Sequence, residues 1–587
     1  MELFSLIVSK LEYYVWNFGI PVQGEMIPII VIVLLGTGVF LTLRLGFIQL
    51  RRLGHGFAVT SGRYDDPAEP GDVSHFQALT TALSATVGIG NIAGVAIAIH
   101  FGGPGALFWM WVTALLGMAI KYSEVTLAQH FRKIEFEDRD AHAWEGSVSG
   151  GPMYYIEKGL GRRWKPLAIF FALALITTSF LTGNAVQANT VADTMQTEFG
   201  IAVWITGLCT ALIVAAVIIG GIRRIGAVTG VLAPFMATIY VLGALTILGF
   251  NAGEILPTFA LIFREAFSPT AGVAGTGVGA FLVTMMWGVR RGLFSNEAGQ
   301  GSAPIAHSAA KTDEPVSEGV VALLEPFIDT IVICSMTGLA ILITGVHTER
   351  VPTPIELQGA GDLSFLQAEA DESFVQAGVP DELAYGDGYP EGGPVIAWHE
   401  VAVERLFLDP EQTRPFTGVI DPDRGVALTE DGEELVTLYG DAVESGAPLT
   451  KLAFDRGLAP LGDWGGYIVM LSVLLFAIST AISWSYYGDR CAEYVFGKNA
   501  ILPFKLIFVL MHFTGAVVTL ATVWTLGDVA LGFVTFPNLV ALVLLSGVVV
   551  RLTKSYFERE PWHENYEAHK RWVEERRRKK TGSDPGE

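Results

Sequence analysis

Cysteine and charge are both scarce in this sequence. Only three cysteines, Cys209, Cys334 and Cys491, occur among 587 residues, and their spacing fits neither a metal site nor a disulfide framework. Charged residues make up 17% of the chain, which is too few for a water-soluble protein of this length. The net charge of −21 leaves no basic surplus, so we exclude nucleic acid as a partner.

Motifs of known enzyme chemistry are missing as well. The sequence holds no HExxH and no GxSxG, and its 11 histidines are scattered along the chain. We therefore expect no enzymatic activity and no organic cofactor. A channel is also disfavoured, because the apolar segments carry no charged positions that would form rings along a pore.

Apolar residues are abundant. They make up 51% of the chain, and the mean hydropathy is +0.45. About 20 apolar residues cross the hydrocarbon core as a helix, and no strand-like alternation of apolar and polar residues is evident. The sequence therefore predicts an all-α integral membrane protein with eleven membrane-spanning helices. The predicted spans are 26–46, 77–101, 105–130, 166–188, 202–221, 227–249, 274–290, 317–345, 465–487, 502–523 and 529–551.

Positively charged residues alternate from loop to loop. Of the 38 Lys and Arg, 28 fall in or beside the loops after the first, third, fifth, seventh and ninth spans and in the tail. Because Lys and Arg accumulate in cytoplasmic loops, we predict an external N-terminus and a cytoplasmic C-terminus in the cell (plasma) membrane. Residues 1–25 carry one late cation, Lys10, and aromatic residues, which favour an interfacial helix over a cleavable signal peptide.

A long acidic segment lies between the eighth and ninth spans. Residues 347–464 contain 24 acidic and 6 basic residues, so the rest of the chain has a net charge of only −3. We interpret this segment as a small external domain, in part loop, without a transport role. There are two alternatives. The acidic residues adapt the protein surface to high salt, or the segment receives the signal in a transporter-like amino acid sensor. The predicted segments are 1–25, 26–346, 347–464, 465–551 and a basic cytoplasmic tail, 552–587, near anionic lipid.

Two of the predicted helices contain glycines that would interrupt them. The second span includes SATVGIGNIAG, residues 84–94, and the seventh ends in WGVRRGLFSNEAGQGSAP, residues 287–304. Each break opens a set of five helices, and the two sets start on opposite sides of the membrane. Such a pair predicts an inverted-repeat transporter with its site at the repeat interface.

A pair of broken helices suits a zwitterion and a cation. Freed amides at a half-helix N-terminus attract a carboxylate, and freed carbonyls accept an ammonium group or sodium. We expect carbonyls of Ala85 and Gly88 and hydroxyls of Ser479 and Thr480 to form a sodium site. The alternative is that these hydroxyls only donate hydrogen bonds to carbonyls of the preceding turn of their own helix.

Four carboxyl groups lie in or beside apolar spans, and such groups are functional by default: Glu124, Glu297, Glu325 and Asp329. Glu124 is three residues from Lys121, which predicts a local ion pair. Glu325 and Asp329 share a helix face. Because carboxyl groups can carry protons, a proton-coupled transporter of small amino acids is the alternative to sodium coupling.

Six segments carry a resemblance to a known family: ALTTALSATVGIGNIAGVAIAIHFGGPGALFWMWVTALLGMAIKYSEVTLA, GGPMYYIEKGLG, TGNAVQANTVA, SNEAGQGSAPIAHSAAKTDEPV, EPFIDTIV and FAISTAISWSYYG. They are similar to the alanine or glycine:cation (sodium) symporter family of the amino acid-polyamine-organocation superfamily. The resemblance implies a leucine-transporter-type fold of five plus five helices preceded by one extra helix. It also implies uptake of D- or L-alanine or glycine with Na+ as the coupling ion.

The resemblance further implies a substrate pocket between the two broken helices and the fourth and ninth spans. By motif, the pocket residues are Thr86, Gly88, Gly90, Asn91, Gln187, Met286, Trp287 and Gly288. Helix packing by Gly90 and interhelical hydrogen bonding by Asn91 and Gln187 are the alternatives. A preference between alanine and glycine leaves no mark in the sequence, because one methyl group changes binding by only about 1–3 kcal/mol.

Overall fold

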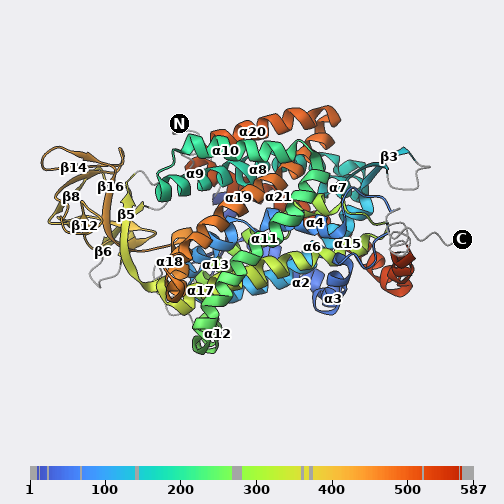
Figure 1. The fold of residues 1–587 in the computed structure, drawn as a ribbon, viewed down its shortest axis with the longest axis horizontal. Helices are drawn as coiled ribbons and strands as arrows, with labels where there is room; N and C mark the ends of the chain where they lie inside the picture. The colour runs from blue at the N-terminus through green and yellow to red at the C-terminus, as the bar shows by residue number, and fades with distance from the viewer. Residues whose placement is uncertain are drawn as a thin grey trace, which may run out of the picture.

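Helices form an elongated body in the computed structural model, and strands gather at one end of it around β5 (Arg350–Glu356) and β16 (Thr437–Val443) (Figure 1). Strand β3 (Lys133–Asp138) lies at the opposite end. The described residues are 10–11, 13–22, 25–66, 69–138, 145–267, 280–357, 363–368, 374–518, 521–567 and 569–571. The fold is therefore mostly helical, with one β-rich segment.

Seven helices of the described chain are long and apolar enough to cross a membrane, or eight if a bent pair counts as one span. The bent pair, His75–Thr86 and Gly90–Gly102, turns by 57°. Three further predicted spans overlap the shorter helices α2 (Ile29–Arg44), α10 (Val203–Ile218) and α13 (Ala280–Asn296), the last of which runs six residues past the predicted end at 290. The seven are Ala106–Phe131, Arg162–Phe199, Gly221–Phe250, Pro315–Thr344, Gly465–Phe496, Lys498–Val517 and Val529–Arg559.

The helices of the long spans and the shorter helices that connect them together form this body. They are α3 (Ile48–Thr60), α4 (His75–Thr86), α5 (Val95–Gly102), α6 (Ala106–Phe131), α7 (Pro152–Leu160), α8 (Lys165–Phe180), α9 (Val186–Phe199), α11 (Gly221–Phe250), α12 (Ile255–Phe267), α14 (Ala303–His307), α15 (Pro315–Ala322), α16 (Leu324–Pro326), α17 (Ser335–Thr344), α18 (Gly446–Leu458), α19 (Gly465–Phe496), α20 (Ile501–Val517) and α21 (Ala521–Arg559). Large apolar side chains such as Leu212, Val231 and Leu510 are exposed on α10, α11 and α20. An outward apolar face of this kind fits contact with lipid.

Three of the helical stretches contain a π-helical turn. These turns are η2 (Gly90–Gly94), η4 (Leu181–Ala185) and η6 (Phe327–Cys334). A π turn shifts the backbone hydrogen bonds by one residue and occurs frequently at functional sites. The turns η2 and η4 are almost wholly buried and η6 is half-buried, so most of the irregular backbone is covered by protein.

The acidic segment folds as β-structure. Its strands pair antiparallel in three sheets, ordered β11-β10-β6-β7, β12-β16-β5 and β15-β14-β13-β8-β9. Ile355, Phe416 and Leu438 belong to a separate hydrophobic core within this segment. The remaining strands are β6 (Leu363–Ala368), β7 (Phe374–Gln376), β8 (Leu383–Gly386), β9 (Tyr389–Pro390), β10 (Val395–Trp398), β11 (Val401–Ala402), β12 (Leu406–Phe407), β13 (Gly418–Asp421), β14 (Val426–Thr429) and β15 (Glu434–Leu435).

The prediction of an all-α chain without strand-like alternation is therefore wrong for this segment. Along β5, Thr353 and Ile355 are buried while their neighbours Pro354 and Glu356 are exposed, which is the period-two pattern of a half-buried strand. After the last strand, α18 returns to the helical body, where the Thr450 hydroxyl donates to the Ile92 carbonyl at 3.0 Å. The insertion thus ends in a helix that packs on the first broken span.

Both termini lie partly outside the described residues. Of the predicted N-terminal interfacial segment, residues 1–9, 12 and 23–24 are not described, and the described part holds helical residues 10–11, a π-helical turn, η1 (Tyr13–Asn17), and a hairpin of β1 (Gly19–Val22) and β2 (Glu25–Pro28). A second hairpin joins β3 to β4 (Glu145–Ser149). The basic tail beyond residue 571 lies outside the described residues.

Candidate functional site

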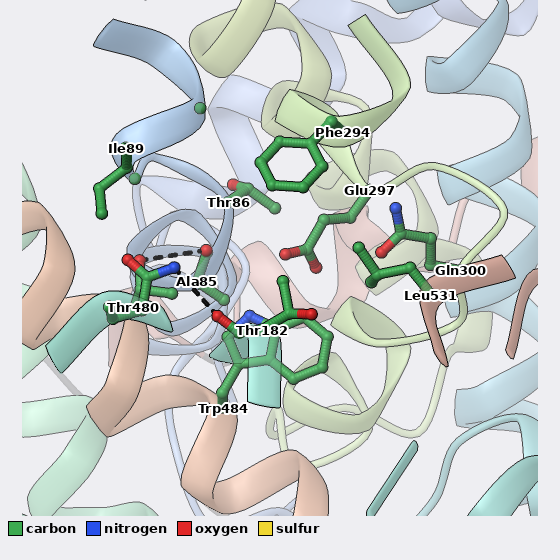
Figure 2. A pocket seen from close by; sticks show the side chains of 13 residues that line it. Ala85, Thr86, Ile89, Thr182, Phe294, Glu297, Gln300, Thr480, Trp484 and Leu531 are labelled. Carbon is green, nitrogen blue, oxygen red and sulfur yellow. Dashed lines mark hydrogen bonds between the residues drawn. The ribbon is translucent and has the colours of Figure 1, made fainter. Parts of the chain in front are cut away.

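A small cavity lies between the two broken spans, η4, α9 and α19. The volume of this cavity is about 30 Å³, and Figure 2 shows the side chains that surround it. The first break contributes Ala85, Thr86, Gly88, Ile89 and Gly90 to its wall. The cavity therefore opens directly onto backbone that is not regular α-helix.

The first break follows a well-capped, buried helix. The Gln77 amide donates to Ser74 Oγ at 3.2 Å and the Ser74 amide donates to Gln77 Oε1 at 3.1 Å, which is a capping box at the start of α4. The helix ends at Thr86. A Cβ on Gly88 would lie 3.0 Å from Thr480 Oγ1, so glycine lets α19 approach this backbone closely.

Asn91 satisfies groups that the first break leaves free. Its Oδ1 accepts a hydrogen bond from the Gly88 amide at 2.8 Å. Its Nδ2 lies 2.6 Å from Asp329 Oδ1 and 3.0 Å from Ser295 Oγ. The Ser295 hydroxyl in turn donates to Asp329 Oδ2 at 2.7 Å. Asn91 therefore ties the first break to η6 and to α13, and all three side chains are fully buried.

The second break begins where α13 ends, at Glu297. Glu297, Gly299 and Gly301 adopt left-handed φ angles of 53°, 89° and 75°. The Ala298 amide donates to Asn296 Oδ1 at 3.0 Å, which stabilises the turn. The Glu297 side chain lines the cavity and its carboxylate points into it (Figure 2). This buried carboxyl group offers oxygen atoms to an ammonium group or a cation.

Hydroxyl and carbonyl oxygens gather between the first break and α19. Thr480 Oγ1 lies 3.1 Å from the Ser84 carbonyl and 3.3 Å from the Ala85 carbonyl. Ser479 Oγ lies 3.3 Å from the Ser84 carbonyl and also donates to Phe476 O of its own helix. Oxygen atoms of this kind suit sodium. Within the described part of the chain, no group of His, Cys, Asp and Glu could hold a metal ion that prefers such ligands.

Polar atoms without partners face the cavity from its other walls. Gln187 Nε2 donates to the Thr182 carbonyl at 3.0 Å (Figure 2), but Gln187 Oε1, Thr182 Oγ1 and Gln300 Oε1 have no hydrogen-bond partner among the described residues. Trp484 closes the wall beside them. Buried polar atoms are nearly always hydrogen-bonded, so a water molecule or a polar ligand is expected here.

Comparison with known proteins identifies the family. The sodium:alanine symporter family matches residues 16–368 and 433–570. The chain belongs to this family. The unmatched residues 369–432 lie inside the acidic insertion. Family membership makes the protein a multi-pass membrane transporter and not an enzyme, and it implies sodium as the coupling ion.

Two sequence relatives and one solved structure illustrate what the chain is similar to, and only the two sequence relatives support the family assignment. The sodium/alanine symporter AgcS of Methanococcus maripaludis is 39% identical over 561 residues, which cover 95% of this chain and 98% of AgcS. The putative sodium/proton-dependent alanine carrier protein YrbD of Bacillus subtilis is 32% identical over 531 residues, covering 90% and 89%. The crystal structure of MhsT in complex with L-phenylalanine has 12% identity and a TM-score of 0.43, covering 83% of this chain and 99% of MhsT.

Six of the residues predicted for this symporter site line the cavity: Ala85, Thr86, Gly88, Gly90, Gln187 and Thr480. Asn91 and Ser479 lie behind its wall, next to Gly88 and Thr480. Met286, Trp287 and Gly288 lie outside it, along α13. Trp287 stacks on Phe101 with 4.7 Å between ring centroids, and a Cβ on Gly288 would come within 2.3 Å of the Ala106 carbonyl. These two residues pack helices together.

Sequence reasoning missed several residues of the wall. Glu297 was predicted only as a functional carboxylate, without a place in the pocket, and Thr182, Gln300 and Trp484 were not predicted at all. Trp484 follows Thr480 by four residues on α19, so the two share a helix face. That spacing is a signal from which Trp484 could have been predicted.

The predicted ion pair between Lys121 and Glu124 is wrong. Lys121 Nζ lies 2.8 Å from Glu325 Oε1 of α16. Glu124 Oε1 accepts from the Gly301 amide at 3.1 Å and from the Asn538 side chain. Both α6 side chains point inward, where partners on other helices compete with the local pair. Glu124 thus helps to hold the second break in place.

Proposed function

We propose that the protein imports alanine, glycine or both across the plasma membrane together with sodium, by alternating access. The observation that carries this proposal is the cavity where the two breaks meet. On one side it offers the Thr480 hydroxyl beside the Ala85 carbonyl, and on the other side the Glu297 carboxylate. Freed backbone amides and carbonyls of the breaks supply both signs of partial charge, which a zwitterion requires.

Roles for individual residues follow from their places. Thr86, Gly88, Gly90 and Gln187 would contact the amino acid, and Asn91 would hold the Gly88 amide in position. The carbonyls of Ala85 and Gly88 and the hydroxyls of Ser479 and Thr480 would bind sodium. Met286, Trp287 and Gly288 would join the pocket only in another state of the transport cycle.

The topology belongs to the same proposal. Eleven spans, as one leading helix and two inverted sets of five in a leucine-transporter-type fold, place the N-terminus outside and the C-terminus in the cytoplasm. Seven Lys and Arg between the third and fourth predicted spans predict a cytoplasmic loop at 131–165, and the alternation of Lys and Arg from loop to loop predicts that the insertion at 347–464 is external. Their positions at opposite ends of the helical body support this orientation (Figure 1).

The decisive measurement is uptake of radiolabelled alanine into proteoliposomes. We expect accumulation against its gradient when sodium is high outside, and none when potassium replaces sodium. A pH gradient in sodium-free buffer tests the runner-up, proton coupling, for which the buried Asp329 beside Asn91 is the candidate group. Uptake that follows the pH gradient and ignores sodium would replace the proposal with that alternative.

Replacing Thr480 by alanine should weaken sodium coupling. The substitution removes a hydroxyl that lies between the Ser84 and Ala85 carbonyls. Loss of one such contact, at about 1–1.5 kcal/mol, should raise the sodium concentration for half-maximal uptake roughly ten-fold, and Thr480→Ser should restore it. Thr178→Ala is the matched control, because the Thr178 hydroxyl bonds only within α8. An unchanged sodium dependence in Thr480→Ala would remove Thr480 from the site.

A further inference from the structure

Two arginines on separate helices converge on Gly547 of α21. Helices α2 and α21 pack against each other, and Arg44 lies in the last turn of α2. A Cβ on Gly547 would lie 3.7 Å from Arg44 Nη2 and 4.0 Å from Arg551 Nη1. Both guanidinium groups therefore reach the same point on the surface of the helix pair, and the glycine leaves a notch at that point.

The two arginines have no acidic partner among the described residues. Both side chains are exposed, and the Arg44 guanidinium lies 5.4 Å from the centroid of the Phe40 ring of its own helix. Lys554, on the next turn of α21, differs because it pairs with Glu558 at 3.7 Å. Since like charges repel, two neighbouring guanidinium groups without a carboxylate favour an anion between them.

A third arginine stands beside this notch at the start of α3. Arg51 Nη1 donates to the Gly46 carbonyl at 3.2 Å, and Gly46 follows Arg44 by two residues. The Arg51 side chain is exposed. A guanidinium group has five N–H donors in a planar fork, so Arg51 keeps donors for a further acceptor. Three helices therefore contribute positive charge to one small area.

Exposed leucines flank the arginines. Leu43 on α2 is 62% exposed, Leu50 on α3 is 67% exposed and Leu544 on α21 is 54% exposed. Leu544 precedes Gly547 by three residues and Arg551 by seven, so the three lie on one face of α21. Apolar side chains exposed at the end of a membrane span fit contact with acyl chains. A ligand at the notch would thus meet positive charge and hydrocarbon together.

We propose that the notch at Gly547 binds the headgroup of an anionic phospholipid. The phosphate would lie between Arg44 and Arg551, with the acyl chains along Leu43 and Leu544. Guanidinium groups bind phosphate through paired, charge-assisted hydrogen bonds, and basic pockets between membrane helices bind such headgroups. The preference of Lys and Arg for cytoplasmic ends explains the presence of arginines here, but not that two of them meet at a glycine.

Thermal unfolding of the purified full-length protein in detergent tests this site without a transport assay, so its outcome is separate from that of the proposed function. The unfolding midpoint is measured against increasing dioctanoyl phosphatidylglycerol, dioctanoyl phosphatidylcholine or inorganic phosphate. Arg551→Gln removes one charge. Gly547→Leu fills the notch and keeps all three arginines, and its Cβ would make only ordinary contacts. Arg163→Gln is the matched control, because Arg163 is exposed in the turn before α8.

We expect phosphatidylglycerol to raise the midpoint at concentrations where phosphatidylcholine and inorganic phosphate do not. Arg551→Gln should raise the half-saturating phosphatidylglycerol concentration roughly five-fold, and Gly547→Leu should raise it at least as much. Arg163→Gln should leave it unchanged. Equal stabilisation by phosphatidylcholine would show that charge is not recognised, and equal stabilisation by inorganic phosphate would show a site for a free anion. Either result, or wild-type affinity in both Arg551→Gln and Gly547→Leu, would overturn the lipid site.

Discussion

Replacing Asn91 by alanine is expected to abolish most alanine uptake. Asn91 is the side chain that both accepts from the Gly88 amide and reaches the Asp329 carboxylate. Without it, the Gly88 amide and Asp329 lose a partner in a water-poor interior. Hydrogen bonds to charged groups contribute about 1.5–3 kcal/mol, so the half-saturating alanine concentration should rise roughly ten- to hundred-fold.

A substitution at a second buried amide side chain distinguishes an effect on alanine binding from an effect on folding. Asn184 lies in η4 and donates to the Phe508 carbonyl at 2.7 Å, and it does not line the cavity. Asn184→Ala should therefore lower thermal stability in detergent without changing the half-saturating alanine concentration. If Asn91→Ala loses stability to the same extent and binds alanine like the wild type, Asn91 is only an interhelical hydrogen-bonding residue.

The first break could be predicted from the sequence because its signals coincide. Gly88, Gly90 and Asn91 fall within seven residues of Ala85 in a span that is otherwise apolar. The structure ends α4 at Thr86, two residues before the first of these glycines.

The second break was harder to place, because glycine has two uses in a membrane helix. Gly288 and Gly292 pack α13 closely on α6, where an added Cβ would lie 2.3 Å from the Ala106 carbonyl and 3.1 Å from Thr113 Cβ. Gly299 and Gly301 adopt the left-handed angles of the turn itself. Composition does not separate these two uses. In this structure the predicted pocket residues Met286, Trp287 and Gly288 consequently lie six to eleven residues before the wall residues Phe294 and Glu297.

The β-rich insertion shows a different limit of sequence reasoning. Its strands are short, several with two to four residues, and turns rich in Gly and Pro separate them. A short strand carries too few alternations to stand out against acidic surface residues. Its internal core, which includes Ile355, Phe416 and Leu438, depends on contacts between segments far apart in the chain.

A buried network of charges lies behind the second break. Lys121 on α6 contacts Glu325 on α16, and His307 of α14 pairs with Glu318 and lies 3.6 Å from Glu325. Burial alone would lower the pKa of His307, but the neighbouring Glu318 and Glu325 carboxylates raise it to about 9, so its imidazole is protonated at neutral pH. The network therefore joins α6, α14, α15 and α16 through alternating charges.

Replacing Lys121 by methionine should be strongly destabilising. The substitution keeps the side-chain volume nearly constant but leaves Glu325 without the ammonium group 2.8 Å away, with both residues fully buried. Removal of one member of a buried ion pair costs about 3–5 kcal/mol, because the other charge loses its close partner. His307, 3.6 Å from Glu325, compensates that charge only in part. We expect a lower thermal midpoint in detergent and a lower yield of folded protein.

The double substitution Lys121→Met with Glu325→Gln removes both charges of the pair. Comparing it with Lys121→Met distinguishes the loss of attraction between the two groups from the cost of burying the Glu325 carboxylate without the Lys121 ammonium group. Because the uncompensated carboxylate is the main cost, the double variant should regain most of the stability that Lys121→Met loses. Lys554→Met is the surface control, since Lys554 and Glu558 form an exposed pair 3.7 Å apart and such pairs contribute about 0–1 kcal/mol. A Lys121→Met protein as stable as Lys554→Met, or a double variant less stable than Lys121→Met, would show that the buried pair does not act in this way.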